Sequence, residues 1–275
     1  MAIKSSAPAW TSAAARRIVE AAGDGLSVEE AVARVCTGLR RGVAESPTNL
    51  DQIASRLGVA SVKSESLPVT GELRKTDRGL EITYASGLPV GRRRFTIAHE
   101  LGHAYFESLG RSAPRRGKEL ERICDMVAVE LLMPADVILR DFPQVSPLSI
   151  FDITMRFRVS FSAAMYRMSY LWGIHVAMDT GSSRIATLGA LRSGDSAVWS
   201  TVNEARTDGT SESMVTLSRN QVWNGAWRVR AAQAESGYVV IATVEPMSID
   251  GRPILKARME TSSPHSPQLT HRVRS

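Results

Sequence analysis

Five consecutive residues, His99-Glu100-Leu101-Gly102-His103, combine the side chains of a hydrolytic metal site. Two histidines four positions apart project from the same side of a helix, so both rings can bind one metal ion. Glu100 lies one position further round the helix, where its carboxylate can contact a water molecule that the metal activates. Because the chain has only 5 histidines in 275 residues, this spacing is seldom a coincidence.

The helix that carries this motif is apolar over much of its circumference, which is typical of a buried helix. Two histidines and a glutamate are costly in such a place unless another group interacts with them, and a metal ion meets that need directly. The apolar residues are Phe95, Ile97, Ala98, Leu101, Ala104, Tyr105 and Leu109.

A second helix must supply a third ligand, since a catalytic zinc usually takes three protein ligands and leaves one position for water. We predict this helix over about 118–133, ended by Pro134. Glu121 and Glu130 compete for the role, and they point in nearly opposite directions because they are nine residues apart. We favour Glu121, because Cys124 and Ala128 on its face are small enough for a close helix–helix approach.

The same face of this second helix carries Asp125, one turn after Glu121. Its carboxylate can accept the free ring N–H of a ligand histidine and fix the tautomer of that histidine. Cys124 fits a small core residue better than a zinc ligand. We interpret His175, which lies beside apolar residues, as a histidine packed in the core. A side chain that stabilises an oxyanion is not identified by the sequence, and Tyr84 and Arg92 are candidates only because they are near the motif in sequence.

The residues before the motif predict helices that lead into a small sheet. Helical spacing covers 11–22 and 28–42, and the second helix opens with a capping box at Ser27-Val28-Glu29-Glu30. Asn49 caps a short helix that Gly58 ends. Two strands, 72–75 and 80–84, then flank a turn at Asp77-Arg78-Gly79 and predict a hairpin.

The residues after the second helix predict two more helices and then short strands. The helices span 147–173 with a break near Val159-Ser160, and the β-like runs are 175–178, 184–191, 197–202, 214–217, 227–231 and 238–244. The sequence thus predicts an α+β protein with a metallopeptidase domain (10–145), a helix-turn-helix-like segment (146–174), a strand-rich C-terminal domain of unknown role (175–260) and a disordered tail (261–275).

The amino-acid composition limits the classes of protein to which the chain can belong. With 43% hydrophobic and 23% charged residues the chain is typical of a soluble globular protein, and no apolar run approaches the roughly 20 residues that cross a membrane. Cys36 and Cys124 are the only cysteines, and the N-terminus has no signal-peptide stretch, so we expect a cytoplasmic protein. The net charge of +6 comes largely from scattered arginines, which we interpret as a solvated basic surface.

The motif and its surroundings resemble the ImmA/IrrE family of metallo-endopeptidases. The resemblance spans about 15–170 and rests on three stretches: Thr96-Ile97-Ala98-His99-Glu100-Leu101-Gly102-His103, then Glu121, Cys124, Asp125 and Ala128, and then Leu131-Leu132-Met133-Pro134. It implies a zincin-like fold in which the edge of a small sheet aligns the substrate. It also implies Zn²⁺ held by His99, His103 and Glu121, with Glu100 as general base.

The family's substrates imply a partner for this chain, a helix-turn-helix (XRE-type) transcriptional repressor that is cleaved to release genes in mobile elements or stress responses. The rival interpretation is a DNA-binding regulator that uses 147–173, where Arg156, Arg158 and Arg167 are available for phosphates. We favour the alternative that these helices pack on the catalytic domain and touch no DNA, because asparagine and glutamine that would read bases are missing from this segment. A third interpretation, an inactive metal-binding protein, is disfavoured by the presence of Glu100.

Overall fold

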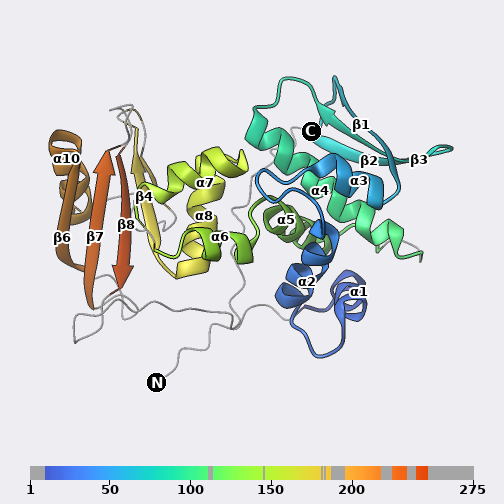
Figure 1. Ribbon diagram of the computed structural model, residues 1–275, viewed down its shortest axis with the longest axis horizontal. Helices are drawn as coiled ribbons and strands as arrows, with labels where there is room; N and C mark the ends of the chain where they lie inside the picture. The colour runs from blue at the N-terminus through green and yellow to red at the C-terminus, as the bar shows by residue number, and fades with distance from the viewer. Residues whose placement is uncertain are drawn as a thin grey trace. The chain divides into compact units, whose positions relative to one another are not determined.

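The computed structural model describes residues 10–110, 114–144, 146–180, 182, 184–186, 196–217, 225–233 and 240–246. The chain divides into two compact units, one within Met1–Pro134 and the other within Ala135–Met259, whose elements are labelled in Figure 1. Helices and small sheets occur in both units, so the predicted α+β class is confirmed.

The first unit begins with three helices whose starts follow from local capping: α1 (Ala13–Ala22), α2 (Val28–Arg40) and α3 (Leu50–Arg56). Ser27 and Glu30 form the predicted capping box at the start of α2. The side chain of Asn49 accepts two backbone N–H groups at the start of α3. Gly58 follows α3 with a φ of +74°, a backbone conformation that glycine adopts without strain.

A three-stranded sheet follows, with β1 (Val59–Glu65), β2 (Gly71–Thr76) and β3 (Gly79–Ala85) in the order β1-β3-β2. The antiparallel pairing of β2 with β3 confirms the predicted hairpin. The parallel pairing of β1 with β3 was not predicted, since it depends on a crossover that leaves no local signal. Because β3 is central, β2 is an edge of the sheet.

Two long helices carry the predicted site, α4 (Val90–Ser108) and α5 (Lys118–Leu132). Helix α4 packs against β2 and β3 and also against α5 (Figure 1). The prediction that α4 is a buried helix is confirmed. Its buried residues are Thr96, Ile97, Ala98, Glu100, Leu101, Gly102, Ala104 and Phe106.

Helix α5 is held by residues from far earlier in the chain. It contacts α1 and α2, and at its first turn the carboxylate of Glu119 accepts the backbone N–H of Thr11 at 3.1 Å and of Ser12 at 2.9 Å. In its last turn the Leu131 carbonyl accepts a 2.7 Å hydrogen bond from the hydroxyl of buried Thr48. Hydrogen bonds from earlier parts of the chain therefore fix the position of both ends of α5.

The second unit opens with α6 (Ala135–Asp141), α7 (Ser149–Phe157) and α8 (Phe161–Trp172). The break between α7 and α8 falls where the sequence predicts it. Arg158 takes a left-handed conformation with φ of +53°, and the side chain of Ser160 then caps α8 by accepting the N–H of Ala163.

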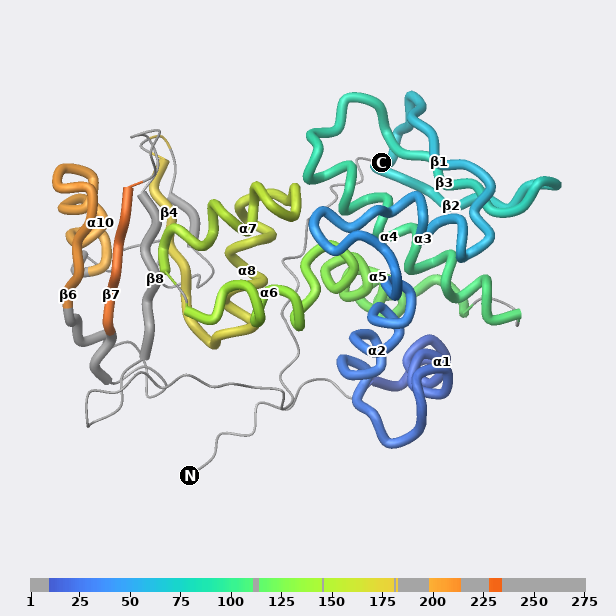
Figure 2. The backbone as a smooth tube through the Cα atoms, in the orientation of Figure 1, coloured from blue at the N-terminus to red at the C-terminus, as the bar shows by residue number. Residues whose placement is uncertain are grey.

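A five-stranded antiparallel sheet completes the second unit, in the order β5-β4-β8-β7-β6. Helix α10 (Ser196–Asp208) contacts β6, β7 and β8 and runs alongside β6 and β7 in Figure 2. The strands are β4 (His175–Asp179), β5 (Arg184–Ala186), β6 (Thr210–Leu217), β7 (Gly225–Gln233) and β8 (Val240–Pro246).

The strand predicted at 197–202 is wrong, because these residues lie within α10. The six-residue stretch reads as a short apolar run, but the buried side chains continue beyond it at helical spacing: Val198, Trp199, Val202 and Ala205. Six residues cover fewer than two helical turns, which is too short a stretch to reveal a helical period.

Part of the C-terminal arrangement predicted from the sequence lies outside the described residues and is not tested. Residues 187–191 of one predicted strand and the predicted tail at 261–275 lie outside the described residues, and so do His265 and His271. The domain boundaries proposed from the sequence stay a prediction. Among the helices that the structure describes, none combines the length and apolar character needed to cross a membrane.

Candidate metal centre

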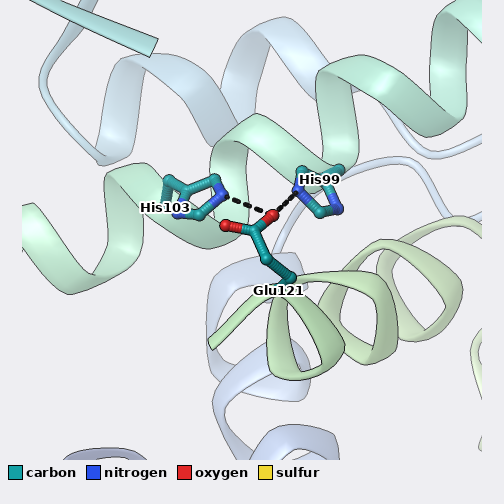
Figure 3. Close-up of side chains that lie close together, drawn as sticks. All are labelled: His99, His103 and Glu121. Carbon is teal, nitrogen blue, oxygen red and sulfur yellow. Dashed lines mark hydrogen bonds and ion pairs between the residues drawn. The ribbon is translucent and has the colours of Figure 1, made fainter. Parts of the chain in front are cut away.

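His99, His103 and Glu121 come together between α4 and α5. Each offers one donor atom, and these atoms all lie within 4.8 Å of one another. Figure 3 shows the carboxylate of Glu121 between the two imidazole rings. Its Oε2 lies 3.2 Å from Nε2 of His99 and 3.6 Å from Nε2 of His103. Ligands on a tetrahedral zinc, with bonds of about 2.0–2.1 Å, are separated by about 3.4 Å, so the two distances from Glu121 to the histidines suit ligands of one metal ion.

The helices approach closely enough for this because a glycine faces a cysteine. A Cβ atom at Gly102 would lie 3.0 Å from Cα of Cys124 and 3.2 Å from its Sγ. Cys124 and Ala128 are both fully buried, which agrees with the close approach predicted from their size. The helix spacing is therefore set by small side chains at the contact.

Asp125 holds the ring of His99 from the opposite side. Its Oδ1 lies 2.8 Å from Nδ1 of His99. A proton on Nδ1 satisfies this carboxylate and leaves Nε2 as the atom that can bind a metal. Burial alone would lower the pKa of His99, but the hydrogen bonds to Asp125 and Glu121 outweigh it and raise the pKa to about 9.

Glu121 stays ionised in this environment. Hydrogen bonds from His103 and His99 hold the pKa of its carboxyl group well below the usual range, although burial opposes them. The donor set is therefore one carboxylate and two imidazoles, which suits a borderline metal such as zinc.

Glu100 lies beside the donor group and is not part of it. It is 6% exposed, and its Oε2 has no hydrogen-bond partner among the described residues. Burial raises the pKa of Glu100, while the charges of His99 and His103 lower it. A buried carboxylate without a partner is costly, so the site is suited to a small polar molecule at this oxygen.

Gly71, at the start of the edge strand β2, packs directly over Glu100. A Cβ atom there would collide with Cγ2 of Thr96 and would lie 3.4 Å from Oε1 of Glu100. The sequence analysis missed Gly71 because nothing near it signals that β2 begins against α4. It also missed Arg116, whose charge lowers the pKa of Glu100, because only the fold brings the connection before α5 near the site.

The alternative ligands do not join the group. Glu130 is buried, but the cluster of donor atoms among the described residues contains Glu121 and not Glu130. Burial raises the pKa of the Cys124 thiol well above its usual range, which disfavours the thiolate that a metal would need. His175 lies in the second unit, where burial lowers its pKa to about 4.

Two of the three arginines that the sequence offers to DNA phosphates have partners within the second unit, whereas Arg158 is exposed between α7 and α8. Arg156 forms an ion pair with Asp141. Arg167 is 6% exposed, with its guanidinium over the ring of Tyr170. The exposed side chains of α8 are Ser162 and Tyr170, so this helix presents no cation or amide for reading bases.

The fold and the site define a class of protein, a mixed α+β protein in which two packed helices bring together two histidines and a glutamate that could hold a metal ion. Residues 54–169 match the family model Peptidase_M78, described as the IrrE N-terminal-like domain. This match supports the resemblance of residues 54–169 to the ImmA/IrrE family, whose members are generally metal-dependent peptidases.

Among solved structures, one similar chain is a Mycobacterium tuberculosis transcriptional regulator. The two share 18% identity with a TM-score of 0.47, and the match covers 78% of this chain and 75% of that one. No curated protein matches the chain.

Proposed function

We propose that the protein is a zinc-dependent endopeptidase that cleaves a regulatory protein, a helix-turn-helix (XRE-type) transcriptional repressor. One observation carries the catalytic part of this proposal. A buried glutamate with an unpartnered oxygen, Glu100, lies next to a cluster of three donor atoms within 4.8 Å of one another.

His99, His103 and Glu121 would hold the zinc. When bound, the metal supplies Lewis acidity that activates a water molecule and stabilises negative charge on a carbonyl oxygen. Asp125 supports this by keeping the Nδ1 proton on His99, so that Nε2 always faces the donor cluster.

Glu100 would act as the general base. Its unpartnered Oε2 accepts a proton from water as the water oxygen attacks the peptide carbonyl carbon. The same oxygen then returns the proton to the amine nitrogen as the C–N bond breaks. Burial raises the pKa of Glu100, which makes its carboxylate a stronger proton acceptor.

The substrate would bind along β2. This strand is an edge of its sheet, so its outer backbone groups can pair with an extended peptide. Gly71 begins the strand against Glu100, so a peptide paired there passes beside the general base. The choice of a repressor as substrate rests on the resemblance to the ImmA/IrrE family, and a cytoplasmic location would suit its two free cysteines.

The test measures how the wild type and two variants cleave helix-turn-helix repressors, beginning with any that is encoded beside this gene. The zinc-loaded wild type is expected to cut the repressor at one site. Glu100→Gln is expected to retain one zinc per chain by calorimetry and to cut at least 1,000-fold more slowly, because the amide cannot accept the proton. Glu107→Gln, on the same helix outside the donor cluster, is the matched control and should cut at the wild-type rate.

Two results would refute the proposal. Cleavage at the wild-type rate by Glu100→Gln would remove Glu100 as the base. An uncut repressor in the presence of zinc-loaded wild-type protein would remove the proposed substrate.

A further inference from the structure

We propose that Tyr84 is the residue that donates a hydrogen bond to the oxygen of the scissile carbonyl as negative charge develops on it. This inference rests on the proposed peptidase function and deepens it. Neither the donor cluster nor Glu100 supplies such a hydroxyl group. Tyr84 is placed for the role by the register of the hairpin formed by β2 and β3.

The register puts Tyr84 directly opposite Gly71. The N–H of Ala85 donates to the carbonyl of Thr70 at 2.9 Å, which makes Gly71 and Tyr84 a non-hydrogen-bonded pair. In such pairs the Cα atoms are only about 4.5 Å apart, and the side chains are closer than at other positions. Tyr84 is therefore the nearest cross-strand neighbour of the residue that packs over Glu100.

The direction of the Tyr84 side chain follows from that of Gly71. A Cβ atom at Gly71 would point at Thr96 and Glu100 on α4. Residues paired across two antiparallel strands share a face of the sheet, so Cβ of Tyr84 also points to the side of α4. Ile82, two residues earlier on the same face, is fully buried, as expected for a face that packs on this helix.

Two further features suit a catalytic donor. Gly71 has no side chain, so β2 lies close over Thr96 and Glu100 of α4, on the side to which Cβ of Tyr84 points. Tyr84 is half-buried, and its hydroxyl group has no hydrogen-bond partner among the described residues. A phenol that is fixed by a strand and still has an unused donor is suited to stabilise an oxyanion.

The other candidate from the sequence, Arg92, is less well placed. It is exposed in the first turn of α4. It lies seven positions before His99, which corresponds to about 10 Å along the helix axis.

The experiment removes only the hydroxyl group. Tyr84→Phe keeps the aromatic ring and removes only the hydroxyl group, so the packing of the ring is preserved. We expect kcat for repressor cleavage to fall about 100-fold, with KM, zinc content and melting temperature unchanged. Tyr105→Phe, on α4, is the matched control, and Arg92→Gln tests the rival; both should retain the wild-type kcat.

A second measurement does not depend on cleavage. Acetohydroxamate binds zinc through oxygen atoms that take the position of the reacting carbonyl. We expect Tyr84→Phe to weaken its binding to the zinc-loaded protein about 3- to 10-fold by calorimetry, the worth of one neutral hydrogen bond, whereas Tyr105→Phe leaves it unchanged.

The outcomes separate this inference from the proposed function. Equal acetohydroxamate binding by Tyr84→Phe and the wild type would overturn the role of Tyr84, whatever the substrate proves to be. A loss in Tyr84→Phe that appears in KM alone would also overturn it. Failure of the wild type to cut the repressor would refute the proposed substrate, and the acetohydroxamate measurement would still decide the role of Tyr84.

Discussion

The contact between Gly102 and Cys124 predicts that a single methyl group would open the metal site. In Gly102→Ala the new Cβ would lie 3.0 Å from Cα of Cys124 and 3.1 Å from its Cβ. The nearest atom belongs to the backbone of α5, so it cannot move aside by a change of rotamer. The two helices must separate by roughly 0.4–1 Å to restore an ordinary contact.

The energetic result combines two opposing effects. Alanine is favoured over glycine within a helix by about 1 kcal/mol. Overpacking in a core costs about 1–3 kcal/mol, so we expect a net loss of up to about 2 kcal/mol in the free energy of unfolding.

Metal binding should change more than stability does. Oε2 of Glu121 lies 3.2 Å from Nε2 of His99, and this separation widens if α5 moves away. Metal–ligand distances tolerate changes of only about 0.2 Å. We expect zinc affinity to fall about 10- to 100-fold, as when a residue that orients a ligand is lost.

The matched control is Gly38→Ala in α2, where a new Cβ would meet nothing within 4 Å. That variant should gain about 0.5–1 kcal/mol and bind zinc normally. Urea unfolding of the metal-free proteins and competition with a zinc chelator measure the two effects. Equal stability and equal zinc affinity in the two variants would refute the idea that close helix packing sets the site.

Two further predictions concern pH. The pKa of His99 is about 9 without metal, so zinc must displace a proton, and its affinity should fall about tenfold for each pH unit below 9. Calorimetry at pH 7 in buffers of different ionisation heat should detect about one proton released; none released would contradict the assignment of His99 as a ligand. Burial lowers the pKa of His175 to about 4, from 6.5 in the unfolded chain, so the unfolded state binds the proton first as pH falls. The second unit should therefore lose about 3 kcal/mol of stability between pH 6.5 and 4. His175→Gln should remove that dependence in urea unfolding followed by tryptophan fluorescence, and an unchanged slope would be evidence against it.

The sequence predicted those parts of the site that local spacing determines. The i, i+4 histidines and the capping signals at Ser27 and Asn49 act within one or two helical turns, so they are readable without the fold. Helical periodicity showed only that Glu121 and Glu130 cannot both face the metal, and the small residues on the face of Glu121 decided between them. Glu121 lies in the donor cluster.

The sequence did not predict contacts between residues distant in the chain. Gly71 reaches Glu100 only because β2 begins against α4, and no local pattern encodes that packing. The parallel pairing of β1 with β3 likewise depends on the path between the strands. Helix α10 was missed because its six-residue apolar stretch was judged without the turns that follow it.

The anchoring of α5 shows that the recognisable motif is shorter than the piece of chain that must fold together. Thr11, Ser12 and Thr48 bind the two ends of the helix that carries Glu121, and all three precede the region 54–169 that matches the family. A fragment trimmed to that match would expose the side of α5 that contacts α1 and α2. The position of Glu121 thus depends on helices and loops that precede the matched region.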